Sequence, residues 1–98
     1  SIVEVDAIRA WKRHLQMTLN IIVPLGVVFF VFIDQEGAVR EEVVGENRYI
    51  RLTVPPGIWF GFKGFGNKAN MVLNIANIPH DPNEVERLSL DDLDYIWR

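Results

Sequence analysis

Lys12 and His14 are the two side chains of this sequence best suited to acid–base chemistry, and they stand two residues apart. Residues 8–15 alternate in character, which predicts a β-strand with Ile8, Ala10, Lys12 and His14 on one face. A lysine in such a partly apolar wall can act as a general base when burial lowers its pKa toward neutrality. The alternative for Lys12 is an ammonium group that reaches solvent or pairs with an acid. The alternative for His14 is a histidine that is hydrogen-bonded in the wall of a pocket.

Arg9, Trp11 and Arg13 fall on the opposite face of the same predicted strand. If the strand is regular, Arg9 and Lys12 cannot line one pocket, and only a β-bulge or a strong twist brings them together. Two uses are open for the Arg9 guanidinium. One is bidentate binding of a phosphate group, and the other is an ion pair at the surface or at a subunit interface.

Aromatic side chains and amides supply further candidates for a ligand site. Most of the aromatic residues near these segments are expected in the core or in a dimer contact, and one or two can stack on a base or a sugar face. They are Trp11, Trp59, Phe60, Phe62 and Phe65. Asn70, Asn74 and Asn77 interrupt an otherwise apolar strand, and buried amides need hydrogen-bond partners. Asn74 is therefore expected either to donate into a pocket or to satisfy a neighbouring turn.

Short strands must position these side chains. Strands separated by turns every 8–12 residues are typical of an antiparallel sandwich or barrel. The sharpest turn is Pro55-Pro56-Gly57, where proline fixes φ and glycine permits a positive φ. The continuous apolar run over residues 27–33 predicts a central strand or one buried on both faces. Strands are predicted over residues 2–5, 8–15, 19–23, 27–33, 38–44, 49–54, 58–63 and 71–76.

Residues 81–98 differ in composition, because they hold six of the 13 acidic residues of the chain. We expect this acidic tail to be a solvated cover. Ser89 can cap a short helical turn within it, and the residues 95–97 are expected to pack back on the barrel. His80, in the loop before the tail, is expected to be structural or solvated.

Length and composition limit the class of protein. The 98 residues predict one domain, and the absence of cysteine excludes a disulfide framework, a thiolate metal site and a cysteine nucleophile. The formal net charge is −3 and no basic face is evident, which argues against nucleic-acid binding. The longest apolar stretch, residues 21–33, is shorter than the roughly 20 residues of a membrane span. No signal peptide is evident, so we expect a cytoplasmic protein without a membrane contact.

Three segments of the chain resemble the dTDP-4-dehydrorhamnose 3,5-epimerase family, a cupin group that acts on deoxythymidine-diphosphate sugars. They are Ile8-Arg9-Ala10-Trp11-Lys12-Arg13-His14, Pro55-Pro56-Gly57-Ile58-Trp59-Phe60-Gly61-Phe62 and Asn74-Ile75-Ala76-Asn77 with Asp81-Pro82. The resemblance spans roughly residues 5–97 and implies a jelly-roll fold. It also implies a metal-free proton abstraction beside a sugar ketone, with a histidine base, a tyrosine acid and an arginine on the diphosphate. The family has several tens of residues ahead of the first segment, which this sequence is expected to lack.

The family's functional positions fall on changed residues in this chain. The arginine is kept as Arg9, but the catalytic histidine falls on Lys12, a second histidine falls on Phe60, and the tyrosine falls on Asn74. The resemblance therefore suggests Lys12 as the base, His14 as its orienting partner or as the group that polarises the ketone, and Asn74 as a donor to the enolate. Arg9 would hold phosphate, and Trp11, Trp59 and Phe60 would contact the ligand.

A metal site is not expected. His14 is the one residue that matches the four ligands of a metal-binding cupin, and a bound metal takes three or more protein ligands. No cofactor is expected either.

These observations predict a single all-β domain over residues 1–98, an antiparallel jelly-roll (cupin) barrel with a short C-terminal helical turn. The first functional hypothesis is an epimerase-like enzyme for dTDP-4-keto-hexoses. The second is a barrel that binds a nucleotide sugar or small carbohydrate without turnover, as a sensor or partner subunit, and the third is a structural module. A homodimer is expected because the core is small and because a long apolar strand must not become an open edge.

Overall fold

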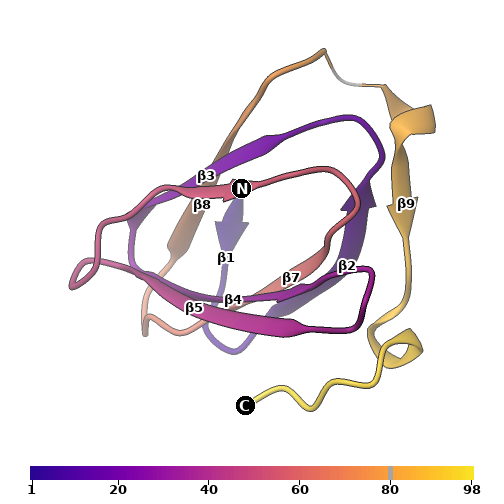
Figure 1. Ribbon diagram of the computed structural model, residues 1–98. Coiled ribbons are helices and arrows are strands. Elements are labelled where there is room, and N and C mark those ends of the chain that lie inside the picture. The colour runs from indigo at the N-terminus through magenta and orange to yellow at the C-terminus, as the bar shows by residue number, and fades with distance from the viewer. Residues whose placement is uncertain (80) are drawn as a thin grey trace.

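Within residues 1–79 and 81–98, which the computed structural model describes, nine strands form two antiparallel sheets (Figure 1). One sheet contains, in spatial order, β1 (Ile2–Val3), β8 (Asn70–Ala76), β3 (Leu19–Leu25) and β6 (Leu52–Val54). The other contains β5 (Val39–Gly45), β4 (Val27–Ile33), β7 (Trp59–Gly64), β2 (Ile8–His14) and β9 (Val85–Arg87). Two 3-10 turns follow Asp81 and Ser89, at Pro82–Glu84 and Leu90–Asp92. The predicted jelly-roll fold is confirmed. None of the described segments is a helix of the length and apolarity that crossing a bilayer requires.

The core lies between the two sheets. Along β3, Leu19, Ile21 and Val23 are buried and the residues between them are less so, which is the alternation of a strand with one face inside. The strand β4 is buried on both faces and lies between β5 and β7, so the predicted central strand is confirmed. Its side chains at Val28, Phe30 and Phe32 fill the space between the sheets.

A second apolar cluster lies on the outer face of the five-stranded sheet, beneath the end of the chain. Trp11 is 2% exposed there, its ring lies 5.3 Å from that of Trp97 and 5.9 Å from that of Tyr95, and its Nε1 donates to the carbonyl of Leu90 at 3.3 Å. In Figure 1 the yellow C-terminal segment leaves β9 and turns back toward β4 and β5. The predicted packing of Tyr95 and Trp97 and the predicted helical turn after Ser89 are confirmed, whereas Ile96 is 91% exposed and its predicted packing was wrong.

The acidic tail also contains a strand that the sequence did not predict. Residues 85–87 form β9, which pairs with β2 in the register Lys12↔Arg87 and His14↔Val85. The segment has three residues, of which two are charged, and it is too short to show an alternation of apolar and polar side chains. The pairing satisfies backbone groups of β2 that would otherwise form a sheet edge.

Because β4 is central within one chain, its apolar character gives no reason for dimerisation, and that argument from the sequence was wrong. The strand β5 occupies the edge beside it, and the exposed charges of Arg40 and Glu41 make this edge unattractive to a further strand. The homodimer stays a prediction.

The turn at Pro55-Pro56-Gly57 is confirmed, and it reaches the end of β2. Gly57 has a φ of +87°, which explains why glycine stands here. Its N–H donates to the carbonyl of His14 at 2.8 Å. This contact joins the β6–β7 connection to the strand that holds Lys12 and His14.

Candidate functional site

A β-bulge in β2 decides which of its side chains face the interior. Arg9 and Lys12 pair with two phenylalanines of β7 that stand two residues apart, although they themselves stand three apart. Those phenylalanines pack against the core, and directly opposed residues of antiparallel strands share a face. Arg9 and Lys12 therefore both face inward, while Ala10 and Trp11 both pack in the outer cluster. The predicted regular alternation was wrong at Arg9 and Ala10, and the bulge on which a pocket shared by Arg9 and Lys12 depended is present.

Lys12 lies where two cavities meet, and we call the combined hollow the Lys12 cleft. One cavity, of about 330 Å³, is lined by Arg9, Lys12 and Arg87 among others. A second, also of about 330 Å³, is lined by Lys12, His14 and Asn74. Phe60 borders both. Lys12 and His14 of β2 and Asn74 of β8 thus line one cavity.

The Arg9 end of the cleft is cationic. None of the ion pairs among the described residues includes Arg9, Lys12 or Arg87, and no carboxylate lines this cavity. Lys12 and Arg87 stand directly opposite on β2 and β9, where like charges are unfavourable. Burial lowers the pKa of the Lys12 ammonium, and the positive charge of Arg87 lowers it further. Uncompensated positive charge in a cavity favours an anionic ligand.

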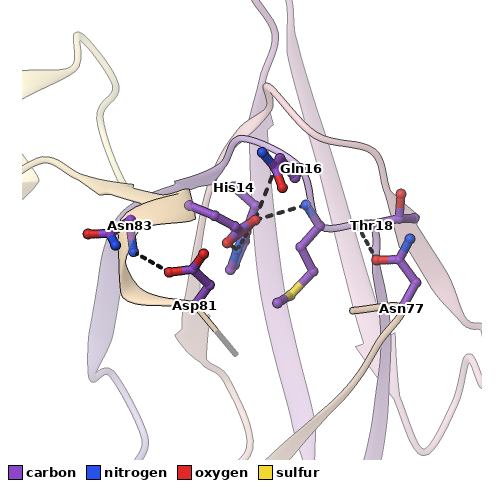
Figure 2. A network of polar contacts seen from close by, with 8 residues as sticks. His14, Gln16, Thr18, Asn77, Asp81 and Asn83 are labelled. Carbon is purple, nitrogen blue, oxygen red and sulfur yellow. Dashed lines mark hydrogen bonds and ion pairs between the residues drawn. The ribbon is translucent and has the colours of Figure 1, made fainter. Parts of the chain in front are cut away.

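His14, which borders the cleft and is labelled in Figure 2, pairs with the buried carboxylate of Glu84. His14 Nδ1 lies 2.8 Å from Glu84 Oε2 and 3.2 Å from Oε1, and the two residues are 8% and 3% exposed. The backbone N–H groups of Met17 and Gln16 donate to Glu84 Oε1 at 2.8 and 3.3 Å. Burial alone raises the pKa of the Glu84 carboxyl, but these hydrogen bonds outweigh it and hold the pKa below its ordinary value.

Glu84 and Arg87 are the two residues of the site that the sequence did not single out. The tail was expected to be a solvated cover, and at Glu84 this expectation was wrong. The tail holds six acidic residues, and nothing in the sequence distinguishes Glu84 from the other five. The one available signal was His14 itself, because a histidine in an apolar wall needs a hydrogen-bond partner.

Acid is expected to destabilise the fold through Glu84. Its folded pKa lies below the ordinary value of 4.5, so the unfolded chain takes up this proton first. The contribution of the Glu84 carboxylate to the free energy of unfolding is therefore complete above pH 4.5. It is lost as the pH falls through 4.5 toward the folded pKa. Urea unfolding measured from about pH 7 to about pH 3 tests this expectation. Glu84→Gln should flatten the acid slope, and a slope equal to that of the wild type in this variant would contradict the assignment.

The three asparagines have different surroundings. Asn70 is fully buried, and its amide accepts from Val27 N and donates to the carbonyls of Val3, Gly66 and Lys68. Asn77 accepts from Thr18 N at 2.9 Å (Figure 2). These two amides hold the backbone, whereas Asn74 borders the cleft beside Lys12 and His14.

The aromatic candidates separate into two groups. Phe60 is 7% exposed in the wall of the cleft, and its ring lies 6.1 Å from that of His14 at an angle of 15°. Trp59 packs in the outer cluster, with the Arg13 guanidinium 4.6 Å above its ring. Trp11 reaches the rim of the Arg9 cavity, but its buried side chain also belongs to the outer cluster. Stacking of these two indoles on a ligand does not agree with this placement, because both side chains pack in the outer cluster.

The chain has both sequence and structural relatives among known proteins. No protein-family model matches it. The curated protein named "Probable low-salt glycan biosynthesis epimerase Agl13", from Haloferax volcanii, is 29% identical, with 86% of this chain and 60% of the relative covered. A dTDP sugar isomerase from Desulfovibrio desulfuricans G20 has a similar structure with a TM-score of 0.90 and 33% identity, covering 94% of this chain and 63% of that one.

A more distant structural neighbour shares the fold. It is the dTDP-4-dehydrorhamnose 3,5-epimerase from Sulfolobus tokodaii, with a TM-score of 0.80 and 19% identity over 97% of this chain and 58% of that one. The present chain thus spans about three fifths of the length of these relatives.

Proposed function

Since the chain is similar in sequence and fold to a dTDP sugar isomerase, and in sequence to a probable glycan biosynthesis epimerase, we propose that it binds a nucleotide sugar of the dTDP-4-keto-hexose type in the Lys12 cleft. The observation that supports this best is the composition of the cleft, with cations at one end and proton-transfer groups at the other. A nucleotide sugar has the same division, because its diphosphate is anionic and its ketone is neutral. Arg9 and Arg87 would hold the diphosphate, and the sugar would lie toward His14 and Asn74.

The chemistry that this arrangement supports is proton abstraction beside the ketone without a metal. The carbon acid is weak, so a base must lie within hydrogen-bond reach of its proton. The enolate oxygen that forms needs a donor or a positive charge nearby. Lys12 and His14 supply side-chain nitrogen bases to the described lining of the cleft, and Asn74 is an amide donor on the facing strand. The sequence favours Lys12 as the base.

Binding without turnover is the second candidate function. It is favoured by Phe60, whose apolar ring occupies the wall next to His14 where a further proton-transfer group could otherwise stand. A sugar could then lie against the ring without reacting, and the protein would act as a sensor or as a partner subunit.

Deuterium exchange separates the two functions. The protein is incubated with dTDP-4-keto-6-deoxyglucose in heavy water, and the sugar is analysed by mass spectrometry and proton NMR. We expect deuterium at a carbon that flanks the ketone, because an abstracted proton is replaced from solvent. Binding of the sugar without any exchange would exclude the epimerase and support the second function. Absence of binding, with the fold intact, would exclude both.

A further inference from the structure

The Lys12 cleft is chemically one-sided. It lies between the two sheets, and a further cavity of about 230 Å³ adjoins it beside His14. Among the described residues that line these hollows, every titratable side chain belongs to the five-stranded sheet, namely Arg9, Lys12 and His14 of β2 and Arg87 of β9. Arginine stays protonated in proteins. The proton-transfer groups are therefore Lys12 and His14, two residues apart on one strand.

The four-stranded sheet faces the same hollow with a wall that cannot transfer a proton. The strand β3 contributes Leu19 and Ile21, and β8 contributes Val72, Leu73 and Asn74. The first four side chains are apolar. The amide of Asn74 can donate a hydrogen bond to an oxygen, but it neither gives up nor takes a proton.

Other polar groups do not supply an acid to this wall. Ser1 lies at the rim, and its amino group donates to the carbonyl of Val72 at 2.8 Å. The chain has two tyrosines. Tyr49 is 69% exposed, and Tyr95 packs in the outer cluster, where its hydroxyl donates to the Glu41 carboxylate. No tyrosine and no described carboxylate lines the cleft, so the tyrosine acid that the family resemblance implies is missing here.

Inversion of a carbon centre needs proton transfer on both faces of the sugar ring, because a proton leaves one face and another arrives on the opposite face. A ring bound between the sheets has one face toward β2 and the other toward β3 and β8. Only the first of these faces meets a described proton-transfer group. Since general acid–base catalysis contributes roughly 100- to 10,000-fold, inversion should be slower than transfer on the first face by about this factor.

We propose that the Lys12 cleft moves the ketone of a 4-keto sugar to the neighbouring carbon C3, by proton transfer on the ring face toward β2, and that it does not invert a stereocentre. This inference rests on the proposed function and makes isomerisation, rather than epimerisation, its outcome. Either Lys12 or His14 can take the proton from carbon with the same result, because both lie on that face.

The reaction balances within the sugar and these side chains. The bond between C3 and its hydrogen breaks, and its electron pair forms a double bond to C4 while the ketone oxygen becomes an enolate. The oxygen on C4 then gains a proton and the oxygen on C3 loses one. A proton returns to C4 from the face toward β2, and the carbonyl forms at C3. The side chains end as they began, and the sugar is neither oxidised nor reduced overall.

Product analysis of the wild type with dTDP-4-keto-6-deoxyglucose tests the proposal. Reduction with borodeuteride labels the carbon that carried the ketone, and mass spectrometry of the hydrolysed sugars locates the label. We expect label at C3 in part of the sugar. Proton NMR of the same reaction should show that the recovered 4-ketone keeps its configuration at C3 and C5. Inversion at C3 or C5 as fast as deuterium exchange from heavy water would overturn the proposal, although the proton abstraction of the proposed function would stand.

A variant with an acid on the second face tests the cause of this selectivity. Asn74→Tyr adds a phenol to the wall opposite β2, and inverted sugar should then appear. Ile75→Tyr is the matched control, because Ile75 is the next residue of β8, is 62% exposed and does not line the cleft. This control should form the same products as the wild type. Inversion by the wild type equal to that by Asn74→Tyr would overturn the proposal.

Two further results would contradict it at different steps. Deuterium at C3 with retained configuration, but without any 3-ketone, would overturn the shift of the carbonyl. Binding of the sugar without exchange would overturn the isomerisation together with the epimerase function, and it would leave binding without turnover as the function of the cleft.

Discussion

Replacing Trp11 with alanine is expected to lower the free energy of unfolding by about 3–5 kcal/mol, the usual cost of removing a large aromatic side chain from a core. Trp11 is 2% exposed, lies at contact distance from Tyr95 and Trp97, and donates a hydrogen bond to Leu90. Without its indole, the C-terminal segment loses the surface on which it packs. Urea denaturation followed by circular dichroism measures the change.

A milder variant separates packing from hydrogen bonding at this position. Trp11→Phe keeps most of the aromatic contact and loses the bond to Leu90, so it should cost about 1 kcal/mol. The opposite pattern, with normal stability but weakened binding of dTDP in Trp11→Ala, would return Trp11 to the ligand site that the sequence predicted for it.

Replacing Arg87 with alanine is expected to weaken binding of dTDP roughly 10- to 150-fold, because a hydrogen bond to a charged group contributes about 1.5–3 kcal/mol. Arg87 lines the cationic end of the cleft beside Arg9, and none of the described carboxylates pairs with it. Isothermal titration calorimetry at two salt concentrations measures the affinity, and the wild type should lose more affinity with added salt than the variant does.

The control for Arg87 is another arginine with the same charge and no place at the cleft. Arg51 is exposed and does not line either cavity, so Arg51→Ala should bind dTDP almost as the wild type does. Equal losses in the two variants would mean that overall charge, rather than a phosphate contact at Arg87, governs the affinity.

The scaffold could be predicted because its signals are local. Hydrophobic alternation, the continuous apolar run of β4 and the turn at Pro55-Pro56-Gly57 each act within a few residues. Counting residues along the strand placed Lys12 and His14 on one face, whereas only the resemblance to the epimerase family suggested that Asn74 shares a site with them.

Two features of the site could not be predicted because they depend on distant partners. The bulge in β2 shifts the pairing with β7 by one residue. The types of residues 9–12 alone do not indicate that one of them is left out of the regular pairing. The strand β9 forms because its backbone pairs with the edge of β2. Its three residues therefore need no alternation of apolar and polar side chains by which a strand could be recognised. Arg9 and Trp11 were therefore assigned to one face, although the structure places them on opposite sides of the sheet.

The long separation between the partners of the site has a consequence for folding. His14 and Glu84 are 70 residues apart in the chain, and Arg87 follows Glu84 closely. Their contacts form only when a loop of this length has closed, and this closure costs conformational entropy that contacts between neighbouring residues do not bear. The site is therefore expected to be completed after the local turns of the sandwich have formed.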